Sequence, residues 1–479
     1  MHLHLIRIVA LHEIRTVFRS KMPFILYSIL LAMLLLAGFV GWNYVSKFNA
    51  QQARYTTEVQ DNWMNQPERH PHRVAHYGYL VFREKAPLSF FDFGLDSYVG
   101  NSVFLEAHRQ NTVNMSEAGF SNGMLRFGEL SMALVLQLLV PLFIIFLGFA
   151  TVAGLKQNGV LKILLCQKAS YFDILAGKTA GLVAVTWLLF LPLILAALIG
   201  GAVLLQNEIN AELLLRSGLI LFVYAVYFLI ITMIVTGVSA MSKNASNALI
   251  MLVLGWMVCF IVIPKSAQTL GSSLYKAPDK IAFEQAIEAE VRKEGDSHNP
   301  DDPHFAALRA NTLKKYGVDS VHKLPVNYGA MVMQEGERIT SGIFGTQFNK
   351  LIETYQAQNA VSVILGFFDP YLPLRNISMQ LCGVDFDTFS EFQKQTEQYR
   401  FDKTTLINKI HLTQISYEND RAQKVAQSNW QQMPPFEFRP VPLAATIYNA
   451  KWSLIALLFW LVAGAAALGF ISSQRKFQL

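Results

Sequence analysis

Six long apolar stretches constrain this chain more than any other feature of its sequence. They occupy residues 22–45, 130–154, 180–205, 217–241, 248–264 and 452–473. An α-helix rises about 1.5 Å per residue, so about 20 apolar residues cross a hydrocarbon core about 30 Å thick. The sequence therefore predicts an all-α membrane protein with about six transmembrane helices, of which the fifth is the shortest.

The composition agrees with this class. Hydrophobic residues make up 52% of the chain and charged residues 15%, with a mean hydropathy of +0.31, whereas soluble domains carry about 25% charged residues. No Asp, Glu, Lys, Arg or His lies well inside any of the six stretches. Ion-coupled transporters usually keep such groups within the membrane. The sequence therefore favours a protein whose energy comes from another subunit.

Basic residues are unevenly distributed among the short connections. Lys and Arg occur in residues 1–21 and 155–179, at Lys243 and after the last stretch, whereas residues 206–212 contain Glu208 and Glu212 and no basic residue. Because cytoplasmic loops are rich in Lys and Arg, we predict that both termini are cytoplasmic. The segments 46–129 and 265–451 would then lie outside. The net charge of +6 reflects the inner loops, which argues against a nucleic-acid partner.

Residues 1–21 predict an amphipathic helix in the membrane interface. One helical face is apolar and another is basic. The apolar face would consist of Leu3, Ile6, Ala10, Ile14 and Val17, and the other of His4, His12, Arg15 and Arg19. A basic flank that only sets the topology explains the same residues, and both interpretations remain open.

A short string, residues 174–179, ends like a phosphate-binding loop. A phosphate-binding loop requires a glycine five residues before Gly177, but this chain has Phe172 there. Such a loop also joins a strand to a soluble helix, whereas this string continues into the third apolar stretch. We therefore expect the chain to have no nucleotide site and no catalytic residues of its own.

The inner loop, residues 155–179, resembles the corresponding loop of ABC-2 type ABC transporter permeases. The matching residues are Gly159, Leu161, Leu164, Leu165, Leu175, Gly177 and Lys178; the two acidic positions of the family fall on Leu155 and Gln157, and its threonine on Val160. In that family this loop contacts a separate ATPase subunit and transmits its motion. The resemblance thus implies an ATPase-coupling loop formed by Lys156, Gln157, Gly159, Leu161, Lys162, Leu165, Tyr171, Asp173, Gly177 and Lys178. A positively charged loop that only fixes the topology remains the alternative.

The external segments resemble the ABC-2 subgroup that carries a domain of unknown function, DUF3526. In the first segment the resemblance rests on a motif formed by His76, Gly78, Pro87, Asp92, Gly94, Glu106 and His108. In the second segment it rests on residues 368–370 and 436–440. It implies one large external domain that is split between the first and last external loops. Residues 280–294, 349–368 and 386–430 predict long helices in it, with Asp385 as the cap of the last.

Three histidines in the first segment, His70, His72 and His76, are weak candidates for a copper or zinc site. Pro71 and the flanking arginines indicate an exposed loop, so we predict no metal site. We expect Glu106 and His108 to have a structural hydrogen-bonding role, because no nucleophile accompanies them.

These features favour a permease subunit of an ATP-driven ABC-2 transporter that exports or extracts an unidentified substrate across a bacterial inner membrane. We expect no cofactor on this chain, with ATP and Mg on the partner ATPase. The expected partners are membrane lipids, ABC ATPase subunits, a second permease copy or homologue, and a protein in the periplasm. Two alternatives remain. In one, ATP hydrolysis moves the external domain to act on an external partner without transport; the other is a membrane receptor or sensor without an ATPase.

Overall fold

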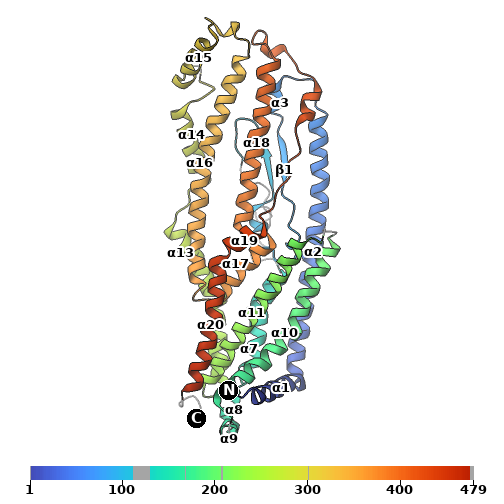
Figure 1. Ribbon diagram of the computed structural model, residues 1–479, viewed down its shortest axis with the longest axis vertical. Helices are drawn as coiled ribbons and strands as arrows, with labels where there is room; N and C mark the ends of the chain where they lie inside the picture. Colours follow the sequence, from blue (N-terminus) through green and yellow to red (C-terminus); the bar gives the residue numbers. More distant parts are fainter. Residues whose placement is uncertain (1, 112–129, 168, 206–208, 300, 475–479) are drawn as a thin grey trace.

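The computed structural model describes residues 2–111, 130–167, 169–205, 209–299 and 301–474. The molecule is elongated and mainly helical (Figure 1). The amino-terminal helix α1 (Leu3–Arg19) and the end of α20 (Lys451–Ser473) lie at one end of the long axis, and α15 (Pro303–Tyr316) lies at the other.

Among the described residues, six helical segments are long and apolar enough to cross a membrane, which confirms the predicted number. They are Lys21–Met64 (α2), Met132–Gln157, Tyr171–Leu204 (α10), Ala211–Met241 (α11), Ala245–Leu274 and Lys451–Ser473 (α20). The second consists of α6 (Met132–Leu134), a π-helical turn (Val135–Leu139), α7 (Val140–Gly148) and α8 (Ala153–Gln157). The fifth consists of α12 (Ala245–Met257), a π-helical turn (Val258–Val262) and α13 (Ile263–Leu274).

Two of these helices extend well beyond their apolar stretches. Helix α2 continues past residue 45 to Met64, because residues 46–64 contain neither Gly nor Pro. The fifth span continues past Pro264, which is the second residue of α13 and lies two residues after the π-helical turn. A π-helical turn relieves the missing backbone donor of a proline within a helical segment.

Helix α11 lies at the centre of the membrane part. Its Tyr224, Tyr227 and Phe228 are fully buried and belong to the main hydrophobic core, together with Phe143 of α7 and Phe190 of α10. Polar contacts also tie α11 to the π-helical turn of the second span, for example the hydrogen bond that the Tyr227 hydroxyl donates to the carbonyl of Gln137 at 3.0 Å. Figure 1 shows α7, α10 and α20 beside α11.

The described parts of the two segments that are predicted to be external, 46–129 and 265–451, form a second part of the molecule, which we call the outer domain. The first contributes the upper half of α2, the short helices α3 (Pro71–Ala75) and α4 (Asp96–Val99), and an antiparallel pair of strands, β1 (Tyr79–Phe82) and β2 (Ser102–Leu105). The second contributes α14 (Lys280–Glu294), α15, α16 (Tyr328–Leu365), α17 (Tyr371–Cys382), α18 (Phe386–Gln414) and α19 (Leu443–Asn449), with 3-10 turns at Val321–Lys323, Asp420–Ala422 and Gln427–Gln432.

One hydrophobic core joins the two segments. Trp63 of α2 and Val81 of β1 are buried in it with Phe392 of α18 and with Trp430. The indole of Trp63 donates a hydrogen bond to the carbonyl of Trp430 at 3.1 Å, and the indole of Trp430 donates to the carbonyl of Pro67 at 3.3 Å. The outer domain is therefore a single folded unit that is built from both loops.

The outer helices differ in extent from their predicted ranges. Helix α14 begins and ends at residues 280 and 294, as predicted. The predicted helix 349–368 is the second half of α16, which begins at Tyr328. The predicted helix 386–430 was too long: α18 ends at Gln414, and Asn419 then adopts a left-handed conformation with φ of 55°. Asp385 caps α18 as predicted and accepts a hydrogen bond from the amide of Asp387 at 3.0 Å.

Candidate functional site

The inner loop folds into a helical hairpin at one end of the molecule. Helix α8 and α9 (Val160–Cys166) are joined at Gly159, whose φ of 72° is a conformation that glycine adopts at little cost. Figure 1 shows both helices at the same end as α1, beyond the ends of α10 and α11. Leu161 is buried and Leu165 partly buried against Tyr171 and other apolar residues.

The hairpin is anchored to the end of α11. The hydroxyl of Ser239 accepts hydrogen bonds from the amides of Val152 and Ala153, both at 3.1 Å. The carbonyl of Ala240 accepts from the ammonium of Lys156 and, at 3.3 Å, from the hydroxyl of Tyr171. The side chain of Gln157 accepts from the amide of Ala245, where α12 begins. A force on the hairpin would therefore reach α10, α11 and α12.

Only part of the predicted coupling loop is accessible. Gln157 and Lys162 are exposed, whereas Lys156 and Gly159 are half-buried. Beside Lys162, the side chain of Ile163 is 59% exposed and that of Val160 is 38% exposed. The accessible residues of the predicted loop therefore include Gln157 at the end of α8 and Val160, Lys162 and Ile163 of α9.

The last part of the predicted loop belongs to α10. This helix begins at Tyr171, because the hydroxyl of Ser170 accepts a hydrogen bond from the amide of Asp173 at 3.1 Å and so caps it. Asp173 is fully buried and accepts hydrogen bonds from the amide of His2 at 2.9 Å and from its ring at 3.0 Å. Asp173 thus binds the start of the amino-terminal segment.

Helix α1 packs directly across the start of α10, and two glycines make this contact possible. A methyl group added at Gly177 would lie 2.6 Å from the Cβ of Val9 and 2.9 Å from the carbonyl oxygen of Ile6. At Gly181 it would lie 2.7 Å from the Cβ of Glu13. Because real side chains do not approach so closely, only glycine allows α1 this position.

A buried ion pair lies in the same contact. The ammonium of Lys178 binds the carboxylate of Glu13 at 2.5 Å, and the hydroxyl of Thr151 donates to the same carboxylate at 2.6 Å. Glu13 and Lys178 are 5% and 6% exposed. Lys178 therefore holds α1. Glu13 was not predicted from the sequence, although it is the single acidic residue of α1 and lies one helical turn before Val17, on the apolar face.

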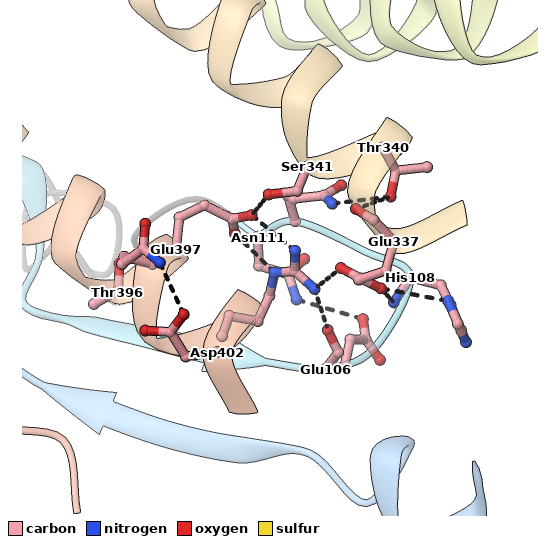
Figure 2. Close-up of polar contacts among 12 residues, drawn as sticks. Glu106, His108, Asn111, Glu337, Thr340, Ser341, Thr396, Glu397 and Asp402 are labelled. Carbon is pink, nitrogen blue, oxygen red and sulfur yellow. Dashed lines mark hydrogen bonds and ion pairs between the residues drawn. The ribbon is translucent and has the colours of Figure 1, made fainter. Parts of the chain in front are cut away.

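A second polar network lies in the outer domain (Figure 2). Arg400 of α18 is 1% exposed and pairs with Glu337 of α16 and, at 2.8 Å, with Glu397. Burial alone would raise the pKa of the Glu337 carboxyl. The hydrogen bond from His108 and the charge of Arg400 together outweigh this effect, so the pKa of Glu337 lies below the ordinary value. Glu337 is therefore a buried carboxylate.

The motif residues Glu106 and His108 join this network from the first segment. The amide of His108 donates to Glu337 at 3.1 Å, and its Nδ1 lies 3.5 Å from the same carboxylate. The carbonyl of Glu106 accepts from Arg400 at 3.5 Å, and its side chain accepts from Asn111 at 3.4 Å. These contacts lock the turn after β2 onto α16 and α18.

The remaining motif residues shape the first segment. Asp92 is buried and accepts hydrogen bonds from Ser378 of α17 at 2.5 Å and from the amide of Gly94 at 3.0 Å. Burial raises the pKa of the Asp92 carboxyl. Gly78 and Gly94 have φ of 75° and 49°, and Pro87 is exposed in the loop before Asp92.

The three candidate metal ligands do not form one group. His72 and His76 lie beside His108, with one possible ligand atom of each within 4.8 Å of the others. His70 instead lies beside His411 and Asp420. Because the additional members come from distant positions in the sequence, the spacing of the three histidines could not reveal either group.

Comparison with protein-family models gives two matches. Residues 7–301 match the model described as "ABC-2 family transporter protein", and residues 280–439 match DUF3526, a domain of unknown function. The first match extends over more than half of the chain and includes most of α1 and the inner hairpin, and the second covers α14 to α18. No curated protein matches the chain.

Proposed function

Because the chain belongs to the ABC-2 transporter family and is thus a permease component of an ABC transporter, we propose that it is one half of a membrane unit driven by separate ATPase subunits. The matched family is a permease domain and not a nucleotide-binding domain. On this proposal ATP and Mg are bound by the ATPase, and the inner hairpin is its docking surface.

The exposed face of α9 carries this proposal. Ile163 and Val160 are apolar and exposed beside Lys162, at the same end of the molecule as α1. Exposed apolar side chains with charged neighbours are typical of protein interaction sites. Since the hairpin is anchored to α11 by the hydrogen bonds at Ser239 and Ala240, a docked ATPase would move the spans directly.

The ion pair between Glu13 and Lys178 connects α1 to α10, the span that follows the inner hairpin. It fixes α1 across α10, while Ile8, Leu11 and Phe18 on other sides of α1 are exposed. Exposed apolar residues on a helix at the end of a membrane span suit the lipid interface. We propose that α1 lies in the cytoplasmic interface and moves with α10.

We propose that the transporter exports an unidentified substrate or extracts it from the membrane. A second candidate is mechanical transmission without transport. The length of α2 favours it: this helix has 44 residues and continues from its apolar half to Trp63 in the core of the outer domain. At 1.5 Å per residue it spans about 66 Å, so movement of the first span would reach the outer domain.

The docking surface can be tested by combining Lys162→Glu with Ile163→Asp. Both side chains are exposed, so we expect normal folding but weaker co-purification with an ABC ATPase subunit, and slower ATP hydrolysis in proteoliposomes. Lys314→Glu is the matched control, because it reverses a charge that is also exposed, on α15 at the opposite end. Undiminished ATPase binding by the double variant would overturn the assigned surface.

The same proteoliposomes separate the functions. Substrate flux that requires ATP supports the transporter. Vigorous ATP hydrolysis without flux, accompanied by an ATP-dependent change in the outer domain, supports mechanical transmission. Repeated failure of any ATPase to co-purify would instead favour a receptor or sensor.

A further inference from the structure

Three imidazoles from two separate turns meet on the surface of the outer domain. His72 lies in α3 and His76 caps its carboxyl end, four residues and about one helical turn later. His108 lies in the turn after β2. The ring centroids are 4.8 Å apart for His72 and His76, 5.2 Å for His76 and His108, and 5.7 Å for His72 and His108.

His108 is held in an orientation that suits a metal ligand. Its Nδ1 faces the Glu337 carboxylate at 3.5 Å, and Arg400 in turn holds that carboxylate. Figure 2 shows one nitrogen of the His108 ring toward Glu337 and the other away from the network. That other nitrogen, Nε2, is buried and has no hydrogen-bond partner among the residues that the structure describes. A carboxylate on the far nitrogen is the usual support of a metal-binding histidine.

The backbone of His108 is also unusual. Its φ of 62° is one of two positive values at non-glycine residues in the described chain. Such a conformation costs free energy at a side chain with a Cβ and persists where surrounding contacts impose it. Here the amide of His108 donates to Glu337 at 3.1 Å. The same contact that imposes this conformation brings the ring beside His72 and His76.

The histidines of α3 are accessible to an ion. A neutral imidazole has a free lone pair for a metal ion. His76 is exposed and His72 and His108 are partly exposed, so an ion can enter from solvent.

The second group, formed by His70, His411 and Asp420, is less available to a metal ion. Asp420 accepts a hydrogen bond from the ring of His411 at 2.7 Å and from Asn327 at 2.6 Å, and its other oxygen lies 3.5 Å from the ring of His70. The Nδ1 of His70 accepts from the amide of His72 at 3.2 Å. Asp420 and the Nδ1 of His70 are therefore already hydrogen-bonded, and both histidines are buried and less accessible to an ion from solvent, so this group is a structural hydrogen-bonded triad.

We propose that His72, His76 and His108 form a binding site for one borderline divalent transition-metal ion, Zn²⁺ or Cu²⁺. Imidazole nitrogens suit these ions, and three of them leave a coordination position open. Exposed His298, whose ring centroid lies 5.7 Å from that of His108, is placed to approach this position. The bound ion connects α3 to the turn after β2 and, through Glu337, to α16.

The test uses the full chain in lipid nanodiscs, purified without a polyhistidine tag and stripped with a chelator. Titration with Zn²⁺, Cu²⁺ and Mg²⁺ is followed by calorimetry, and Co²⁺ is added as a spectroscopic probe of tetrahedral nitrogen coordination. We expect one saturable equivalent of Zn²⁺ or Cu²⁺ per chain and none of Mg²⁺. His76→Gln should weaken binding at least about tenfold, because even outer-shell changes commonly have that effect.

Two control variants keep the result interpretable. His322→Gln removes an exposed histidine elsewhere in the outer domain, and His411→Gln removes a member of the second group; both should bind like the unaltered chain. Because His76 is exposed, its variant should fold, which thermal unfolding verifies, and His72→Gln provides an independent second variant. Absence of saturable binding, unchanged binding in both His72→Gln and His76→Gln, or loss in His411→Gln alone would overturn the site.

Discussion

At the scale of single residues, Gly177 and Lys178 have roles in the structure that the sequence around them does not indicate. Their string ends like a phosphate-binding loop and matches the inner loop of the ABC-2 family, yet both residues face α1. Gly177 leaves room for Val9, and Lys178 pairs with Glu13. Removal of one partner of a buried ion pair is costly because the other charge stays buried. These residues thus connect α1 to the span that follows the hairpin.

Gly177→Ala should loosen this contact. The added methyl group meets Val9 at 2.6 Å and a backbone oxygen at 2.9 Å, and such overpacking typically costs about 1–3 kcal/mol. The cost exceeds the roughly 1 kcal/mol that alanine gains over glycine in a helix. We expect a lower apparent unfolding temperature in detergent and faster tryptic cleavage at exposed Arg15 of α1.

Gly218→Ala in α11 is the matched control, because a methyl group there meets nothing within 4 Å. This variant should be as stable as the unaltered chain or slightly more stable. Equal stability and equal cleavage of the two glycine variants would contradict the packing of α1 on Gly177.

At the scale of elements, α2 matters most for the two candidate functions. Its apolar half predicts a span, whereas its second half is polar and enters the outer domain. Glycine and proline are absent from residues 46–64, so no residue there interrupts the helix. A straight helix transmits displacement along its axis better than two helices joined by a loop.

Ala53→Pro should break α2 between the membrane and the outer domain. Ala53 is exposed and lies inside the helix, where proline removes a backbone hydrogen bond and costs about 3 kcal/mol. Amide hydrogen exchange over residues 46–57 should accelerate, while Ala53→Gln, which replaces alanine by another good helix former, should leave it unchanged. Equally slow exchange in the proline variant would show that α2 is not the continuous element described.

At the scale of the whole molecule, the arrangement has two distinct ends. Helices α1, α8 and α9 occupy one end, and α14, α15 and the upper half of α16 occupy the other (Figure 1). The spans between them are apolar. The two ends therefore face opposite sides of the membrane, and the distribution of lysine and arginine predicts that the end with α9 is cytoplasmic.

Thiol labelling tests this orientation. Cys166 of α9 is exposed, whereas Cys382 is buried and Cys259 partly buried. In vesicles that contain the chain without an ATPase, a membrane-impermeant maleimide should label Cys166 in inside-out vesicles and not in right-side-out ones. Lys314→Cys on α15 should give the opposite pattern. Labelling of Cys166 in right-side-out vesicles would reverse the predicted topology.

The sequence by itself determined the six spans, the bounds of α14 and the cap at Asp385. These features depend on local properties: the length of an apolar run, the absence of helix breakers, and a side chain that bonds its own neighbours. The end of α18 was missed because residues 415–430 contain neither Gly nor Pro, although Asn419 adopts a left-handed conformation there.

Only the tertiary structure decided which distant side chains meet. Glu13 reaches Lys178, His108 reaches Glu337, and His70 separates from His72 and His76. Each of these contacts depends on how helices pack, through the space left at Gly177 or the core around Trp63, and not on spacing along the chain. Hydropathy is a property of consecutive residues, whereas a site is made by residues that the fold brings together, so the spans were predictable and the histidine site was not.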